Sequence, residues 1–252
     1  MSERALFDGV LYGSLVLTLI TAVYLSFATA PYGRHARKGY GSSIANGLGW
    51  TLMEAPAALF PLVLTLLSDR RTVLNWVFLA IWESHYLYRA FVYPVRIRGR
   101  GVPMPWLVAL SGATFNMLNA YLNFRYLTVF GPVYAPAWLS DPRFVAGAVL
   151  FFAGLGVNRY ADRVLLSLRQ PGETAYKIPR GFLYDYISCP NYFGEMVQWA
   201  GWALLTWSMP GLFFALFTAA NLLPRALSHH RDYHRRFPQY PAERRAVFPF
   251  VL

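Results

Sequence analysis

Long apolar runs dominate this sequence and restrict what it can fold into. Runs of about 20 residues, long enough to cross a lipid bilayer as a helix, recur along its 252 residues. Hydrophobic residues make up 56% of the chain and charged residues only 14%. A soluble domain contains about 25% charged residues. The sequence therefore predicts an all-α, multi-pass integral membrane protein.

Seven transmembrane helices are predicted, separated by polar or proline-rich loops. The first five apolar runs cover about residues 7–28, 44–67, 73–94, 105–130 and 144–168. The sixth covers about 192–208, and the seventh continues from about 212 into the polar segment 225–236. Met209, Pro210 and Gly211 lie between the last two runs and predict a break there. A single hairpin bent at Pro210 is the alternative.

Most Lys and Arg residues of the predicted loops lie on one side of the bundle. The other side has Arg4, Arg70, Arg71 and Arg143 in its loops. The loops after the first, third and fifth runs and the tail carry many more: Arg34, Arg37, Lys38, Arg96, Arg98, Arg100, Arg169, Lys177, Arg180, Arg225, Arg231, Arg235, Arg236, Arg244 and Arg245. Because cytoplasmic loops are enriched in Lys and Arg, the N-terminus is predicted outside and the C-terminus in the cytoplasm.

Several partners are not expected from this pattern. The net charge of +11 resides mostly in membrane loops, and no soluble basic domain is visible, so nucleic acid is not expected as a partner. Cys189 is the single cysteine, which excludes an intramolecular disulfide. The spacing of Cys and His does not match a zinc site, and no metal is expected. No repeat or soluble-domain boundary appears, so we expect one domain over residues 1–252.

The stretch 158–195 is the most polar part of this apolar chain. On a helix, Asn158, Asp162 and Arg169 fall within about 40° of one another. Further along, Asn191 and Glu195 share a face with Gln198. A loop between these helices is cationic and aromatic: Tyr176, Lys177, Arg180, Tyr184 and Tyr186. Two polar helix faces joined by such a loop indicate a site for a large anionic ligand, with a solvated loop at the membrane edge as the alternative.

The tail helix adds three polar residues on one side. Arg225, His229 and Tyr233 are each four residues apart, which places them one above the other on a helix. Arginine and histidine at a membrane edge suit phosphate binding. Interaction of these side chains with lipid headgroups is the alternative.

Ionisable groups inside the second and third runs point to a second site. Glu54 lies well inside the second run, and Glu83, Tyr86 and Arg89 follow one another at intervals of three in the third. Such groups are costly in a bilayer and are functional candidates. A carboxyl kept protonated by burial and a phenol can jointly polarise a carbonyl. An ion pair between Glu54 and Arg89 is the alternative reading.

Together these motifs resemble the steroid 5α-reductase family over nearly the whole chain. The C-terminal part contributes Asn158, Asp162, residues 168–173, 176–179 and 191–195, Arg225 and residues 229–233. The N-terminal half contributes residues 30–35, Glu54 with Pro56, His85 with Tyr86, Arg89 and residues 91–93. One position departs from the pattern, because Met53 stands where steroid-reducing members carry glutamine.

The resemblance implies a seven-helix membrane reductase that uses NADPH to reduce the C4–C5 double bond of 3-oxo-Δ4 steroids. Hydride would pass to C5, and Glu54 and Tyr86 would be the catalytic residues that polarise the 3-keto oxygen. Trp50, Met53 and Arg89 would join them in binding the substrate. The residues implied to bind NADPH are Asn158, Asp162, Arg169, Tyr176, Asn191, Glu195, Arg225, His229 and Tyr233. Residues 1–130 would form mainly a lipid-substrate half and 144–252 mainly an NADPH half.

The sequence is also compatible with other functions. The same cofactor could serve reduction of a polyprenal or an enoyl thioester, and a polar C-terminal helix also occurs in membrane methyltransferases that use S-adenosylmethionine. A transporter with Glu54 and Asp162 as ion-coupling carboxylates is a further alternative, although no repeated halves are visible. The expected partners are a steroid-like lipid and the bilayer, with the protein as a monomer. The expected location is the inner membrane in a bacterium or the endoplasmic reticulum in a eukaryote.

Overall fold

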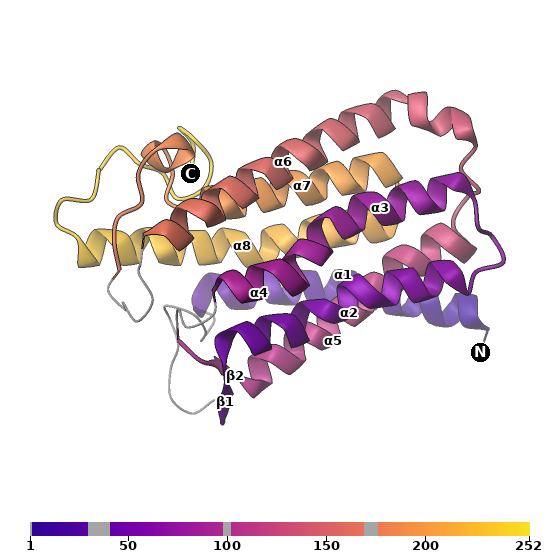
Figure 1. Cartoon of the computed structure of the whole chain (residues 1–252), viewed down its shortest axis with the longest axis horizontal. Coiled ribbons are helices and arrows are strands. Elements are labelled where there is room, and N and C mark those ends of the chain that lie inside the picture. The colour runs from indigo at the N-terminus through magenta and orange to yellow at the C-terminus, as the bar shows by residue number, and fades with distance from the viewer. Residues whose placement is uncertain (1, 30–40, 98–101, 169–175) are drawn as a thin grey trace. The chain divides into compact units, whose positions relative to one another are not determined.

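Helices make up most of the described chain, which confirms the all-α class (Figure 1). The structure, a computed structural model, describes residues 2–29, 41–97, 102–168 and 176–252. It divides into two compact units. Unit 1 comprises Met1–Leu11 with Pro31–Phe144, and unit 2 comprises Tyr12–Ala30 with Val145–Leu252. The assignment of a substrate half and a cofactor half stays a prediction.

Four helices of the described chain are long and apolar enough to cross a membrane. They are α1 (Glu3–Phe27), α2 (Asn46–Leu66), α6 (Pro142–Ser167) and α8 (Met209–Arg236). The other predicted runs correspond to α3 (Val73–Leu87), α5 (Trp106–Arg125) and α7 (Pro190–Thr206). These are shorter, or carry buried polar residues such as Asn119. The chain is a membrane protein, while the count of seven spans and the orientation remain predictions.

The third apolar run is helical throughout but widens in the middle. After α3 comes a π-helical turn, Tyr88–Val92, and then α4, Tyr93–Arg96. In the turn the Tyr93 N–H donates to the Tyr88 carbonyl, five residues back. Pro94 explains the change of winding, because its ring clashes with the carbonyl four residues earlier in a regular α-helix. A second π-helical turn, Tyr126–Phe130, ends the run that contains α5.

In unit 1, α2 packs against both α5 and α3. Pro61 inside α2 has no N–H to offer the Ala57 carbonyl. The buried Trp82 indole on α3 donates to that carbonyl instead, at 2.8 Å. The entrances to α2 and α5 are joined by two short antiparallel strands, β1 (Ser43–Ile44) and β2 (Met104–Pro105). A 3-10 turn, Pro136–Ser140, precedes α6.

Unit 2 depends on a close approach of α6 and α7 through paired glycines. A Cβ on Gly194 would lie 2.6 Å from the Asn158 nitrogen and from the Gly154 carbonyl oxygen. One on Gly147 would lie 2.7 Å from the Gly201 carbonyl oxygen. Each pair is seven residues from the other along its helix, so the glycines form one seam. Small residues at such a seam let two membrane helices pack backbone to backbone.

The break between α7 and α8 comes before Pro210 rather than at it. Trp207 adopts a left-handed conformation (φ 44°) that ends α7, and the Ser208 side chain caps α8 by accepting from the Gly211 N–H at 3.1 Å. Pro210 then lies in the first turn of α8, where a missing N–H costs nothing. The predicted break at 209–211 is thus displaced by two residues. α7 and α8 are separate helices that pack against each other, so two spans and one hairpin stay alternative predictions, with the turn at Trp207 and Ser208.

The C-terminal segment folds back under the loop that precedes α7. A 3-10 turn, Phe182–Asp185, begins this contact region. The backbone N–H groups of Ser188 and Cys189 donate to the carbonyls of Arg245 and Ala246 at 2.8 and 3.1 Å. The Arg245 N–H returns a bond to Tyr186 at 2.9 Å. These bonds anchor the end of the chain beside the start of α7.

Candidate active site

In unit 1, α2 and α5 hold the Glu54 carboxyl between them. Glu54 is only 8% exposed. The Asn116 amide on α5 donates to Glu54 Oε2 at 3.1 Å and to the Met53 carbonyl at 2.7 Å. The Met53 side chain lies against Gly112, where even a methyl group would clash with it. Asn116 therefore fixes both the rotation of the carboxyl and the local backbone of α2.

Arg89 approaches the same carboxyl from the π-helical turn. Its Nε lies 3.7 Å from Glu54 Oε1, longer than the 2.7–2.9 Å typical of a charge-assisted hydrogen bond. The guanidinium stacks over Trp50 and Tyr93, with centroid distances of 4.3 and 4.6 Å. Such contacts stabilise a cation. The structure thus brings Trp50, Met53, Glu54 and Arg89 together, including the ion pair considered as an alternative.

Tyr86 is buried in the aromatic interior of unit 1. It is 3% exposed, and its ring contacts Trp82 and His85, each at 4.9 Å between centroids. The Trp82 indole is itself fixed by its bond to α2. Because Trp82 and His85 limit the rotation of the ring, the direction of the phenol is restrained before any ligand binds.

In unit 2, the glycine seam places Asn158 of α6 beside the first turns of α7. Asn158 is 4% exposed and donates from Nδ2 to the Asn191 carbonyl at 3.0 Å and to Glu195 Oε2 at 3.3 Å. The predicted face of α6 and the predicted face of α7 therefore meet. This cluster offers amide and carboxylate groups side by side, as hydroxyl-rich ligands require.

Arg225 and His229 of α8 meet one tyrosine of α7. Arg225 Nε donates to the Tyr192 hydroxyl at 2.8 Å, and that hydroxyl lies 3.1 Å from His229 Nε2. Since the hydroxyl accepts from arginine, its own hydrogen is available to Nε2, which in a neutral ring puts the proton on Nδ1. Tyr192 thus orients both side chains. Arg225, His229 and the more deeply buried Tyr233 lie along one side of α8, as predicted.

The C-terminal segment packs against Tyr233. Tyr240 stacks on it, with ring centroids 5.0 Å apart. The Tyr240 hydroxyl lies 2.7 Å from Ser188 Oγ, which in turn lies 2.6 Å from His230 Nδ1. All of Tyr233, Tyr240 and Ser188 are buried. This network links α8, the loop before α7 and the end of the chain.

The remaining predicted cofactor residues are more dispersed. Asp162 is buried, and burial raises the pKa of the neighbouring Tyr184 well above its usual value, with the Asp162 charge adding to the effect. The Tyr184 hydroxyl donates to the Ala161 carbonyl at 3.2 Å. Tyr176 is half-buried under the Arg236 guanidinium, 5.0 Å from its ring centroid. Arg169 lies outside the described residues.

Several residues of these clusters had no assigned role from the sequence, among them Asn116, Tyr192 and Tyr240. Asn116 had a usable signal, because an amide inside an apolar run needs a buried partner. Tyr192 and Tyr240 carried none, since aromatic residues are common throughout this chain. No group of three or more His, Cys, Asp or Glu suited to a metal occurs within the described ranges.

Comparison with known proteins identifies the family. The family model described as 3-oxo-5-alpha-steroid 4-dehydrogenase matches residues 102–252. The 3-oxo-5-alpha-steroid 4-dehydrogenase 1 of Bos taurus is 41% identical, over 100% of this chain and 99% of the relative. The steroid 5-alpha-reductase DET2 of Solanum lycopersicum is 38% identical, over 99% and 98%. The chain therefore belongs to the 3-oxo-5-alpha-steroid 4-dehydrogenase family and is a membrane oxidoreductase.

Proposed function

We propose that this protein reduces the C4–C5 double bond of 3-oxo-Δ4 steroids with NADPH, by hydride transfer to C5. Family membership supports the reaction class. Glu54 and Tyr86 of unit 1 would be the catalytic residues that act on the 3-keto oxygen, with Trp50, Met53 and Arg89 around them. The cofactor would be held by the polar clusters of α6, α7 and α8 in unit 2.

The donor set in unit 2 fits a nicotinamide dinucleotide phosphate. Arg225 supplies a cationic donor and His229 a ring N–H donor for phosphate oxygens. Asn158 and Glu195 supply amide and carboxylate groups for ribose hydroxyls or a carboxamide. Asp162 and Asn191 extend this set along the same two helices, and Tyr176 and Tyr233 add aromatic faces. NADPH bound there would supply the hydride for the reaction.

Glu54 acts as a proton-bearing donor in this proposal. Oε2 accepts from the Asn116 N–H, so the proton of the neutral carboxyl belongs on Oε1. From Oε1 it is donated to the keto oxygen, and the Tyr86 phenol donates to the same oxygen. As C5 accepts hydride, negative charge develops on that oxygen and both hydrogen bonds strengthen; protonation of C4 then completes the reduction. The two hydrogen bonds therefore favour the transition state over the ground state.

The observation that carries the proposal is the orientation of a buried carboxyl by Asn116. If Glu54 served only as the ion-pair partner of Arg89, we would expect a shorter distance than the observed 3.7 Å between the two side chains. The hydrogen bond from Asn116 to Glu54 Oε2 would also have no purpose in that pair. Arg89 is meanwhile stabilised by Trp50 and Tyr93. It can therefore keep its position when the carboxyl is neutral.

The direct test is a substrate panel. Purified protein is incubated with NADPH and, separately, with 3-oxo-Δ4 steroids, enals and enoyl thioesters, and the products are analysed by mass spectrometry. The proposal expects 5α-dihydrosteroids, with deuterium from labelled NADPH at C5. Turnover of enals or thioesters without any steroid product would assign the protein to another conjugated lipid instead.

A further inference from the structure

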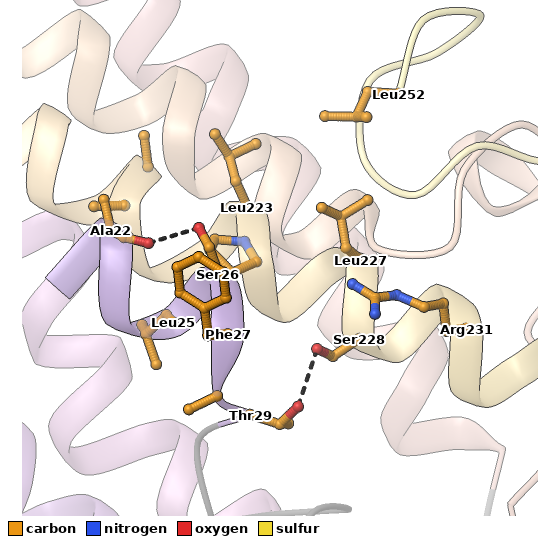
Figure 2. A pocket seen from close by; sticks show the side chains of 14 residues that line it. Ala22, Leu25, Ser26, Phe27, Thr29, Leu223, Leu227, Ser228, Arg231 and Leu252 are labelled. Carbon is orange, nitrogen blue, oxygen red and sulfur yellow. Dashed lines mark hydrogen bonds between the residues drawn. The ribbon is translucent and has the colours of Figure 1, made fainter.

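A pocket opens in unit 2 between the end of α1 and the polar half of α8 (Figure 2). Its volume is about 380 Å³, within the range of small-molecule sites. Leu25 and Phe27 of α1 line one wall, and Leu223 and Leu227 of α8 line another. The C-terminal Leu252 also borders it. The pocket therefore presents a mainly apolar surface to its contents.

Polar groups gather at one end of this pocket. Figure 2 shows the Thr29 and Ser228 hydroxyls facing each other, 3.4 Å apart, with Arg231 beside them on α8. One of the two hydroxyls donates to the other, so the second still has a hydrogen to offer. Arg231 brings five N–H donors and a permanent positive charge to the same end. An apolar wall with a cationic, hydroxyl-lined end has the polarity of an anionic amphiphile's binding site.

Asp232 forms ion pairs with Arg235 and Arg236 of α8, but not with Arg231. Asp232 pairs with Arg236 at 2.8 Å and lies 3.9 Å from Arg235. Within the residues that the structure describes, Arg231 has no hydrogen-bond or ion-pair partner, and it is exposed. Its charge is thus available to a ligand, whereas the charge of Arg236 is already used within α8.

This pocket is separate from the proposed cofactor cluster. On a helix, Arg231 is about 160° away from both His229 and Tyr233. Arg225, His229 and Tyr233 occupy the side of α8 that meets Tyr192 and Tyr240. The side with Leu227, Ser228 and Arg231 meets α1. The two faces of α8 can therefore bind different molecules at the same time.

We propose that this pocket binds an anionic glycerophospholipid. Arg231 and Ser228 would hold the phosphate, and the acyl chain would lie on Leu25, Phe27, Leu223 and Leu227. The end of α1 and the tail are both predicted on the cytoplasmic side, where basic pockets between membrane helices select anionic headgroups. A soluble phosphate would gain nothing from the apolar walls, so a lipid is the occupant that uses both parts of the pocket.

The test measures lipid binding to the full chain by native mass spectrometry in neutral detergent. Phosphatidylglycerol and phosphatidylcholine with the same acyl chains are titrated into wild type, Arg231→Gln and Arg235→Gln. Arg235 is the matched control, because it lies one turn further on α8, is 73% exposed and does not line the pocket. We expect the tightest phosphatidylglycerol site to weaken about tenfold in Arg231→Gln, as for a lost charge-assisted bond, and to persist in Arg235→Gln.

Three results would overturn the proposal. Equal losses in Arg231→Gln and Arg235→Gln would indicate diffuse attraction of lipid to the basic tail. Unchanged binding in both variants would place the tightest site elsewhere. Competition by glycerol 3-phosphate at the lipid's own concentration would show that the phosphate alone is recognised. A second pocket variant, Leu227→Trp, is expected to exclude the lipid without changing the charge, and normal elution of each variant on gel filtration confirms folding.

Discussion

The ring of Tyr240 stacks on the ring of Tyr233, with centroids 5.0 Å apart and planes inclined by 9°. Tyr240 belongs to the C-terminal segment, while Tyr233 is on the α8 side that we propose binds NADPH. The Tyr240 hydroxyl is fixed in turn by Ser188. Tyr240 therefore positions Tyr233, although Tyr240 is not itself one of the proposed cofactor-binding residues.

Loss of this stack should weaken cofactor binding. Tyr240→Leu removes the ring, and aromatic pairs contribute about 0.5–1.5 kcal/mol beyond burial, so we expect the Kd for NADPH to rise about 2- to 10-fold. Tyr240→Phe keeps the stack and loses only the bond to Ser188, so its Kd should rise less. Fluorescence titration with NADPH measures both, and Tyr12→Leu at a 62% exposed site on α1 is the control. A Kd in Tyr240→Leu equal to that of wild type would refute the positioning role.

The glycine seam predicts opposite effects for two glycine-to-alanine changes. Gly194→Ala forces a methyl group into the α6 backbone and should destabilise the protein by about 1–3 kcal/mol. In Gly156→Ala, on α6 itself, the added methyl group meets nothing within 4 Å and should stabilise the protein by about 0.4–1 kcal/mol. Thermal unfolding in detergent, followed by intrinsic fluorescence, compares them. A Gly194→Ala midpoint at or above that of Gly156→Ala would argue against the backbone contact.

Asn116 should affect turnover through the carboxyl that it orients. Asn116→Leu removes the N–H that holds Glu54 Oε2, so we expect kcat to fall about tenfold while NADPH affinity is retained. Thr114→Ala, on an exposed face of the same helix, removes only a bond to the Leu110 carbonyl and serves as the control. Steady-state kinetics with the preferred steroid give both constants. A drop in NADPH affinity with unchanged kcat would mean that Asn116 acts on the fold rather than on Glu54.

The predicted topology can be checked with accessible tags. Tags placed after Leu252 and in the loop at Arg98 should both be cytoplasmic, whereas a tag near Pro136 should be outside. This follows from the concentration of Lys and Arg in the loops after the odd-numbered runs and in the tail. Protease protection in sealed vesicles distinguishes the two sides. An outside location for the Arg98 loop would contradict the predicted orientation, and opposite sides for the Arg98 and Leu252 tags would be incompatible with seven spans.

Local pattern sufficed for the helices and for some of the site. Helical periodicity grouped Asn158 with the α6 face and Asn191 and Glu195 with the α7 face, and the structure joins these faces. Periodicity could not reveal how closely the faces meet, because that depends on glycines of two different helices. From the sequence, Glu54 could be either a protonated donor or the ion-pair partner of Arg89. The structure contains both the contact with Arg89 and the hydrogen bond from Asn116.

Other features depended on contacts far apart in the chain. Ser188, Tyr240 and His230 meet only because the C-terminal segment folds back on the loop before α7. Pro210 was misread for a different reason. Proline next to glycine predicts a break, yet proline is also favoured in the first turn of a helix, and the Ser208 cap decides between the two.

The proposed mechanism depends most on the Glu54–Tyr86 pair. The measurement is the single-turnover rate of steroid reduction at saturating NADPH for Glu54→Ala, Glu54→Gln, Tyr86→Phe and the double variant. Loss of one donor to a developing oxyanion costs about 10²–10³-fold. We predict that loss for Glu54→Ala and for Tyr86→Phe, with NADPH binding intact. Glu54→Gln, which keeps an N–H donor, should retain more activity.

The double variant adds a further condition, because two donors acting on one oxygen should give a less than additive loss. The contradicting result is equally definite. If Tyr86→Phe turns over at the wild-type rate and Glu54→Ala loses only NADPH affinity, the pair does not polarise the substrate. Glu54 would then belong to the nicotinamide pocket or serve as the ion-pair partner of Arg89.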